Sequence, residues 1–353
     1  MKREIYDQIA IEFLKSTATY RSNSQNEVEL IFTSEATAAK AVIKLLSFCI
    51  DMARTKSVLF KSKAPNSKNT QIFNNKLGDT LLTFLLILDF DELRAYFPKH
   101  VFNPMLDRMI LMLNERELVE KARSPGWRIS PAAEQEFVDS LNEFADAYRE
   151  EVNGKDFKVV LKNYQRRSRK NERQLRGLID NVFAAYPKVM VIRVDVAYKE
   201  NHSSMHGYEK ELTLAQVRDH RKKLLKQINK KFSDSLITYA WKLEYGLKKG
   251  YHHHFLFFLD GAKRRQDVVI GKIIGDTWAN VATEGLGIYY NCNGKKENYK
   301  ELCVGIFGRG DIEMIRTLKD GVATYMSKVD FFMKFDSTTQ FRSFGKGAIP
   351  KQK

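Results

Sequence analysis

Two consecutive runs of strand-forming residues, separated by only three residues, constrain the fold of this 353-residue chain more than any other feature. The first run is LITYAWKLEYG (236–246) and the second is GYHHHFLFFLDG (250–261). Both are rich in apolar and aromatic residues, as is typical of strands. A short connection of this kind joins strands that run in opposite directions. The sequence therefore predicts an antiparallel hairpin here.

The residues on either side of this hairpin alternate between strand and helix patterns. KVMVIRVDVAY (188–198) is continuous in apolar residues, as expected of a strand covered on both faces. Helices are predicted for 213–232, for 264–283 and around 320–335, and a short strand for 287–293. We expect an α+β fold with helices flanking a mainly antiparallel central sheet of the ferredoxin-like type.

The N-terminal half follows a different pattern, with apolar residues at spacings of three and four. We therefore expect a helical accessory domain at 1–150, followed by a basic helical linker at 151–185 and an α+β domain at 186–353. Residues 155–176 hold nine basic residues against two acidic ones. This segment is either a solvated linker or an arm that contacts phosphates.

The charge of the chain favours a polyanionic partner. With 59 Lys and Arg against 43 Asp and Glu, the formal net charge is +16, so nucleic acid is the first expectation and an anionic membrane surface the second. The longest apolar run, 81–88, falls short of the roughly 20 residues of a membrane span and predicts a buried helix. The N-terminus lacks the pattern of a signal peptide, and three scattered cysteines match no disulfide framework, so we expect a reducing cytoplasm and no membrane partner.

The predicted helix at 213–232 has one apolar stripe and one basic face. Its basic residues recur at helical spacing, and we expect them to follow a nucleic-acid backbone. The predicted DNA-binding residues are Arg218, Lys222, Lys226 and Lys230.

Three consecutive histidines stand in the second strand of the hairpin. Because side chains alternate between the faces of a strand, His252 and His254 point the same way and His253 points the opposite way. His252 and His254 are therefore the pair that can chelate a metal. Glu244 on the preceding strand lies roughly opposite and is the predicted third ligand, although the sequence does not fix the register.

Two imidazoles and one carboxylate suit a divalent metal ion with open coordination positions. The ligand set favours Mn²⁺ or Zn²⁺, and a phosphate substrate favours Mg²⁺ or Mn²⁺, so we expect Mn²⁺ or Mg²⁺ before Zn²⁺. The alternative is that the histidines are core residues of an aromatic strand. His253 is predicted to pack or to contact DNA.

A tyrosine and a lysine share one face of the last predicted helix. Tyr325 and Lys328 are three residues apart in YMSK, and Tyr325 also belongs to an apolar stripe, so core packing is the alternative. Beside a metal site, Tyr325 would act as a nucleophile toward a phosphodiester and form a phosphotyrosine. Lys328 would hold the phosphate or the phenolate.

These motifs together resemble the HUH endonuclease superfamily, whose signature is two histidines around one hydrophobic residue, with a YxxK motif in the single-tyrosine Rep branch. The order, GYHHHFLFF before YMSK, is similar to replication initiators and unlike conjugative relaxases. WKLEYGLKKGYHHHFLFFLDG, VIRVDVAY and FRSFGKG are most similar to the replication initiation proteins of filamentous phages. His253 departs from the signature, which has an apolar residue there.

The resemblance covers roughly 188–347 and implies an HUH (Rep-like) domain with metal ligands at Glu244, His252 and His254. It implies a nucleophile at Tyr325 assisted by Lys328. The implied activity is nicking of one DNA strand at a rolling-circle origin, with a 5′-phosphotyrosine, a free 3′-OH and later rejoining. Implied partners are single-stranded DNA or an origin hairpin, with host helicase and polymerase as further candidates, in the bacterial cytoplasm. The alternatives are a non-catalytic basic nucleic-acid-binding or regulatory protein and a single-tyrosine HUH transposase.

Overall fold

The chain forms two compact units, one made of Met1–Ala39 with Arg167–Lys353 and the other of Lys40–Arg166. The domain boundaries expected from the sequence, at 150/151 and 185/186, remain a prediction. The computed structural model describes residues 3–17, 19–22, 28–31, 34–62, 72–199, 212–246, 249–298, 304–336 and 342–349.

The unit Lys40–Arg166 is mainly helical, as its apolar spacing predicts. Ser130 caps α7 through its hydroxyl, which accepts from the backbone N–H of Ala133 at 3.2 Å. Residues of the apolar run at 81–88 lie in α3, where Leu81 and Leu85 are buried and Ile87 is exposed. The elements with residues in this unit are α2 (Ser34–Arg54), β3 (Phe60–Ser62), β4 (Ile72–Asn74), α3 (Lys76–Ile87), α4 (Phe90–Ala95), β5 (His100–Phe102), α5 (Pro104–Glu115), α6 (Leu118–Arg123), η1 (Pro125–Arg128), α7 (Pro131–Asn153) and α8 (Lys155–Ala185).

The other unit is built on a six-stranded sheet in the order β10-β6-β8-β7-β12, with β9 also paired to β6. Every pairing within this sheet is antiparallel, and β7 and β8 form the predicted hairpin. The chain is thus an α+β protein, as expected. The strands of this sheet are β6 (Lys188–Tyr198), β7 (Leu236–Gly246), β8 (Gly250–Asp260), β9 (Gly287–Asn291), β10 (Gly305–Gly308) and β12 (Phe344–Lys346).

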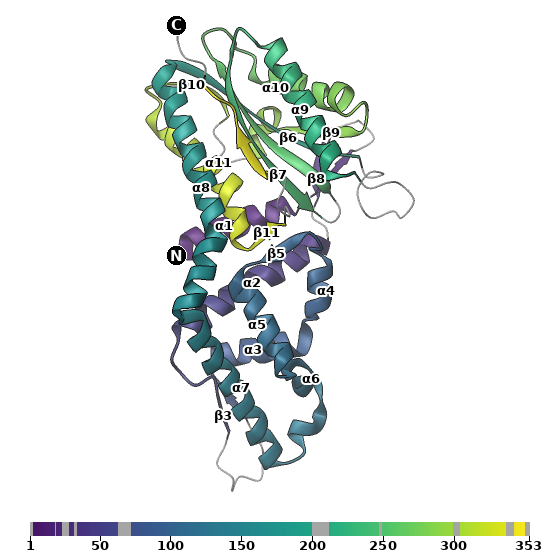
Figure 1. Cartoon of the computed structure of the whole chain (residues 1–353), viewed down its shortest axis with the longest axis vertical. Coiled ribbons are helices and arrows are strands. Elements are labelled where there is room, and N and C mark those ends of the chain that lie inside the picture. The colour runs from purple at the N-terminus through teal and green to yellow at the C-terminus, as the bar shows by residue number, and fades with distance from the viewer. Residues whose placement is uncertain are drawn as a thin grey trace. The chain divides into compact units, whose positions relative to one another are not determined.

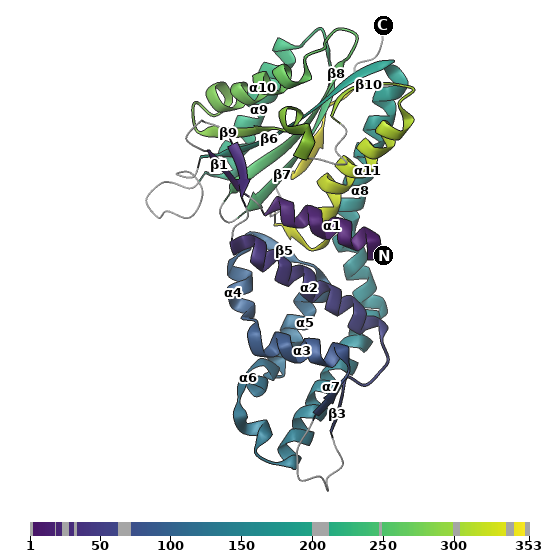
Figure 2. The same ribbon diagram turned by 180° about the vertical axis from the view of Figure 1, so that it is seen from behind.

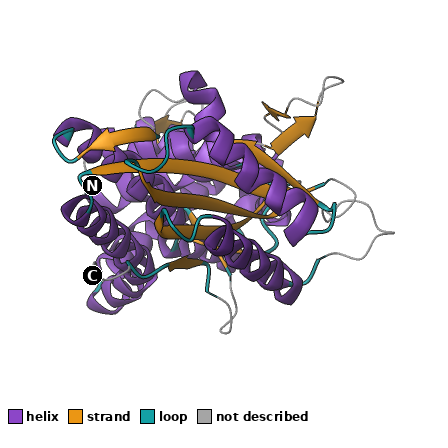
Figure 3. Cartoon of the chain, turned by 90° about the horizontal axis from the view of Figure 1, so that it is seen from above, coloured by secondary structure: helices purple, strands orange, loops and turns teal. Residues whose placement is uncertain are grey.

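Helices cover both faces of this sheet (Figure 1, Figure 3). On one face, α9 (Leu214–Lys231) and α10 (Asp267–Asp276), which continues as a π-helix over Thr277–Ala282, pack on Val194, Phe255 and Phe257. On the other face, α8 and α11 (Ile312–Lys328) pack on Val191, Leu256 and Phe258. Because successive residues of β8 alternate between these two apolar clusters, the strand is covered on both sides.

The N-terminal helix α1 (Arg3–Ser16) packs against the segment that follows α11 (Figure 2). This segment is a 3-10 turn, Val329–Phe331, and leads into β11 (Met333–Phe335). The ring of Phe332 stacks on Phe13 at 5.0 Å and meets Tyr6 edge-on at 5.4 Å between centroids. The remaining elements are β1 (Thr19–Ser22), β2 (Val28–Ile31) and η4 (Cys292–Asn298). Among the described residues, no helix combines the length and apolar character that a membrane span needs.

Two helical glycines make a matched test of the packing on the α10 face. A Cβ at Gly275 of α10 would overlap the ring of Tyr289, which cannot easily move because its hydroxyl donates to Asp276 at 2.8 Å. Gly275→Ala should therefore lower the free energy of unfolding by about 1–3 kcal/mol.

Gly177 of α8 is the control, because a Cβ there meets no atom within 4 Å. Gly177→Ala should raise the free energy of unfolding by about 0.5–1 kcal/mol, since alanine favours the helix. Urea unfolding followed by circular dichroism measures both effects. Equal effects of the two substitutions would contradict the close contact between α10 and β9.

Candidate metal centre

The register of the central strands brings the predicted ligands together. Strand β8 lies between β7 and β6, with Glu244 of β7 directly opposite His252. His254 lies opposite Lys242 of β7 on one side and opposite Asp195 of β6 on the other. The predicted proximity of Glu244 to the histidine pair is therefore present in the structure.

The alternation of β8 separates the three histidines as predicted. His252 and His254 share the face of Leu256 and Phe258, which α8 and α11 cover. His253 lies on the opposite face, fully buried, stacked on Phe255 at 5.5 Å. Neither ring nitrogen of His253 has a hydrogen-bond partner among the described residues. His253 therefore packs within the core and is turned away from the other two.

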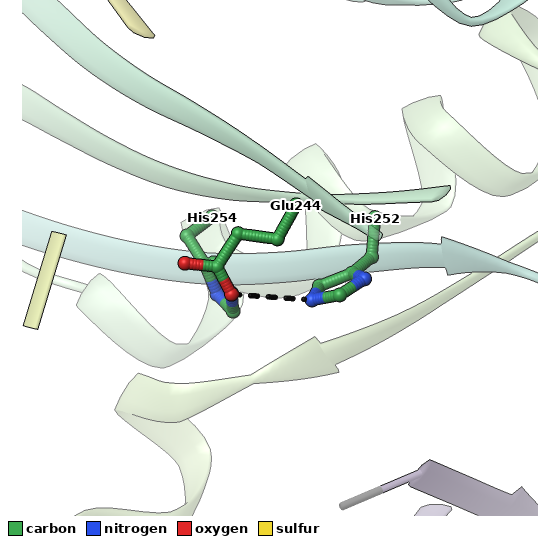
Figure 4. A group of neighbouring side chains, drawn as sticks. All are labelled: Glu244, His252 and His254. Atoms are coloured by element: carbon green, nitrogen blue, oxygen red, sulfur yellow. Dashed lines mark hydrogen bonds and ion pairs between the residues drawn. The ribbon is translucent and has the colours of Figure 1, made fainter. Parts of the chain in front are cut away.

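Glu244, His252 and His254 converge on one point (Figure 4). Their ligand atoms all lie within 4.8 Å of one another, and all three side chains are buried. Oε2 of Glu244 lies 3.2 Å from Nε2 of His254 and 3.4 Å from Nε2 of His252. Two imidazole nitrogens thus face a single carboxylate oxygen. We call this group the Glu-His-His cluster; it could hold a metal ion.

The outer nitrogens of both imidazoles face other acceptors. Nδ1 of His252 lies 3.1 Å from the carbonyl oxygen of Gly250, and Nδ1 of His254 lies 2.8 Å from Oδ1 of Asp195. The carbonyl acceptor of Gly250 requires the proton on Nδ1 of His252, so its neutral imidazole presents a lone pair on Nε2. Nε2 of His254 lies within hydrogen-bond distance of the same carboxylate oxygen. The two Nε2 atoms and the carboxylate oxygen are the donor atoms that a divalent cation between them would take. The residues present therefore fit a divalent metal ion.

The protonation of His252 agrees with this arrangement. Burial, together with the positive charge of Lys249, lowers the pKa of His252 to about 4. Near neutral pH its imidazole is therefore uncharged, as a metal ligand must be.

Asp195 orients His254 from outside the cluster. Arg193, on the same strand and face, donates to both carboxylate oxygens of Asp195 at 3.1 and 3.0 Å. Burial opposes ionisation of Asp195, but the charges of Arg193 and His254 outweigh it and hold its pKa below the ordinary value. A carboxylate behind a ligating imidazole fixes the ring and raises its basicity. Arg193 and Asp195 thus form a buried salt bridge beside the Glu-His-His cluster.

Lys242 completes the charged groups of this face. Its ammonium lies 2.9 Å from Oε1 of Glu244 and 3.0 Å from Oδ1 of Asp330, which follows α11. Burial raises the pKa of Glu244, but Lys242 and then His254 lower it more, so it stays well below its usual range. Sequence reasoning missed these contacts. Alternation places Lys242 on the face of Glu244, but no local signal points to Asp330.

The predicted catalytic pair cannot be placed as side chains. Tyr325 and Lys328 lie in α11, which confirms the predicted helix as far as Lys328; its predicted end is wrong, because Met333–Phe335 form the strand β11. The two side chains fall outside the described residues. Asp330, two positions beyond Lys328, is described and reaches the Glu-His-His cluster through Lys242.

The predicted DNA-binding residues lie on the opposite face of the sheet from the Glu-His-His cluster. Their helix, α9, belongs to the apolar cluster on the side of His253. Lys222, Lys226 and Lys230 are exposed, and Arg218 is partly exposed and donates to Asp219 at 3.2 Å. Arg221 of the same helix lies over the ring of Trp241 at 3.6 Å from its centroid.

The fold and the cluster define a class: an α+β protein whose antiparallel sheet carries a candidate divalent-metal centre on its central strands. The chain belongs to the family described as the YagK/YfjJ C-terminal domain, whose model matches residues 150–347. The matched range includes the whole Glu-His-His cluster, α9 and α11. No curated protein and no solved structure matches the chain.

Removing either imidazole of the cluster should abolish metal binding. His252→Ala and His254→Ala should each lower the affinity for Mn²⁺ by at least about 100-fold, because one of the three ligands found among the described residues is removed. Isothermal titration calorimetry with Mn²⁺ alone measures the affinity.

His253→Ala is the matched control, since it removes an imidazole from the same strand on the other face. It should keep the Mn²⁺ affinity of the wild type while lowering the unfolding free energy, because it leaves a cavity beside Phe255. A loss of Mn²⁺ binding in His253→Ala alone would overturn the assignment of faces.

Proposed function

We propose that the chain is a rolling-circle replication initiator of the HUH type, which nicks one DNA strand through a covalent bond to Tyr325 and later rejoins it. One observation carries the proposal: two imidazoles and a carboxylate converge on the sheet face that α11 covers, and α11 contains the YxxK motif. The resemblance of GYHHHFLFF and YMSK to the single-tyrosine Rep branch supports the same interpretation, and so does an antiparallel sheet flanked by helices.

The metal would be held by Glu244, His252 and His254. When bound, it supplies a positive charge that polarises the scissile phosphate and favours its displacement. Mn²⁺ or Mg²⁺ fits a phosphate substrate better than Zn²⁺ does.

The charges around the cluster suit a phosphodiester. Arg193 neutralises Asp195, and Lys242 lies between Glu244 and Asp330, so these five groups carry one net negative charge. A bound divalent cation would make this group net positive, which attracts a phosphodiester anion.

The proposed reaction conserves the phosphodiester. The hydroxyl oxygen of Tyr325 loses its proton and attacks the phosphorus, an O–P bond forms, and the bond from phosphorus to the 3′ oxygen breaks. That oxygen takes a proton and leaves as a free 3′-OH, while the 5′ end stays on Tyr325. Lys328 favours the phenolate, whose pKa is otherwise about 10. Attack by a 3′-OH on the phosphotyrosine reverses the step and rejoins the strand.

A labelled single-stranded origin oligonucleotide with Mn²⁺ should form a protein–DNA adduct that survives denaturing electrophoresis. Tyr325→Phe should form no adduct, because phenylalanine lacks the attacking oxygen, and a chelator should prevent adduct formation in the wild type. Tyr299→Phe is a control that removes a different hydroxyl. An adduct of normal yield in Tyr325→Phe would assign the nucleophile elsewhere, and no adduct in the wild type with any origin sequence would favour a non-catalytic DNA-binding protein.

The basic face of α9 should contribute to DNA affinity without taking part in the chemistry. The triple variant Lys222→Glu, Lys226→Glu, Lys230→Glu should flatten the dependence of log affinity on log salt by about 0.7–0.9 for each DNA phosphate that these lysines neutralise. The adduct-forming rate at saturating DNA should stay unchanged, because α9 and the Glu-His-His cluster lie on opposite faces of the sheet.

The control carries the same change in net charge in the other unit. Lys40→Glu, Lys44→Glu, Lys56→Glu replaces three exposed lysines there. Equal salt slopes for the two triple variants would show that overall charge, and not the face of α9, accounts for the affinity.

A further inference from the structure

We propose that Lys242 and Asp330 form a buried tether that positions the end of α11 relative to the Glu-His-His cluster, and so sets the distance between the nucleophile helix and the metal. The inference rests on the proposed function for its catalytic meaning. The tether consists of two ion pairs, Glu244 to Lys242 and Lys242 to Asp330. Lys242 is therefore a positioning residue, which acts through Glu244 and Asp330.

The burial of Lys242 makes both ion pairs necessary. Its side chain is only 4% exposed, and its ammonium lies within 3.0 Å of two carboxylates from different elements. An ammonium without a partner at this depth would be strongly destabilising, and two carboxylates this close would repel each other without it. Lys242 therefore holds both carboxylates in place.

The tether also assigns the two oxygens of Glu244 to different roles. Oε1 faces Lys242, whereas Oε2 faces Nε2 of both His252 and His254. Glu244 is thus prepared to bind a metal through one oxygen. The other oxygen connects that metal to the end of α11.

The chain directly after α11 is fixed on three sides. Oδ1 of Asp330 meets Lys242, and its Oδ2 accepts from the hydroxyl of Ser168 on α8 at 3.2 Å. Phe332, two residues later, packs on Tyr6 and Phe13 of α1. Of these three contacts, only the ion pair with Lys242 leads to the Glu-His-His cluster. Of these anchors, Asp330 is thus the one that couples the position of α11 to the metal.

The test compares Asp330→Asn with Asp320→Asn. Asp320 forms an ion pair with Arg176 at 2.9 Å, which also joins α11 to α8 but lies at the surface. The first measurement is Mn²⁺ affinity by calorimetry without DNA. The second is the rate of adduct formation at saturating Mn²⁺ and DNA.

Asp330→Asn should keep the Mn²⁺ affinity within about twofold, because all three ligands remain, and should slow adduct formation at least about tenfold, because the nucleophile helix loses its fixed position. The DNA concentration for half-maximal rate should not change. Asp320→Asn should change neither quantity. The tether is overturned if Asp330→Asn reacts as fast as Asp320→Asn, or if its slower reaction is restored by more Mn²⁺.

Lys242 gives a second signature, which differs in its effect on the Mn²⁺ affinity. Lys242→Met should lower the Mn²⁺ affinity by about 10–100-fold, since Glu244 loses the partner that orients it, and should also slow the reaction. Lys242→Arg should keep part of the Mn²⁺ affinity and part of the reaction rate, because a guanidinium can still reach two carboxylates. The double variant Lys242→Met, Asp330→Asn should react no more slowly than the worse single variant, because both changes break one connection.

Hydrogen exchange separates this inference from the proposed function. The backbone amides of residues 329–332 should exchange faster in Asp330→Asn than in Asp320→Asn, whether or not the protein cleaves DNA. If the wild type forms no adduct, the proposed function fails. Hydrogen exchange and Mn²⁺ affinity would still test whether the tether exists. Equal exchange rates in the two variants would overturn it.

Discussion

The sheet unit depends on the compensation of buried charge on one face of its three central strands. Asp195, Glu244 and Lys242 are all nearly inaccessible to water, a position that is unfavourable for each of them alone. Arg193 compensates Asp195, and Lys242 is shared between Glu244 and Asp330. The remaining oxygen of Glu244, Oε2, faces Nε2 of both His252 and His254. This oxygen and the two imidazole nitrogens are the atoms that could hold a cation.

The two faces of the sheet give the side chains of β8 different surroundings, charged on one face and aromatic on the other, and helices cover both faces. His252 and His254 lie on the side of α8 and α11, with the charged groups of the proposed reaction. His253, between them in sequence, lies among aromatic rings on the side of α9, where burial and then the charge of Arg221 hold its pKa well below the ordinary value. An imidazole that remains neutral costs less to bury, so a third histidine can take the place of the usual apolar residue.

Sequence reasoning succeeded where one local periodicity decides the outcome. The two-residue period of a strand was enough to separate His253 from its neighbours, and a three-residue connection was enough for the hairpin of β7 and β8. The register that sets Glu244 opposite His252 was not accessible from sequence, since a shift of one residue would turn Glu244 to the other face. Arg221 shows the limit for helices: its spacing fits the basic face, but Trp241 offers it an aromatic ring. Asp330 could not be found, because its role depends on where α11 ends in three dimensions.

The unit that holds the candidate metal centre is discontinuous in the sequence, because α1 packs against the segment that follows α11. The family match begins at residue 150, yet Phe332 is fully buried and its stacking partners, Tyr6 and Phe13, belong to α1. Without α1, the aromatic ring of Phe332 would be uncovered, and the chain after Asp330 would have one anchor fewer. The position of α11 thus depends jointly on an apolar contact from the N-terminus and an ion pair from the Glu-His-His cluster. The N-terminal helix is therefore part of the structure that supports the candidate metal centre.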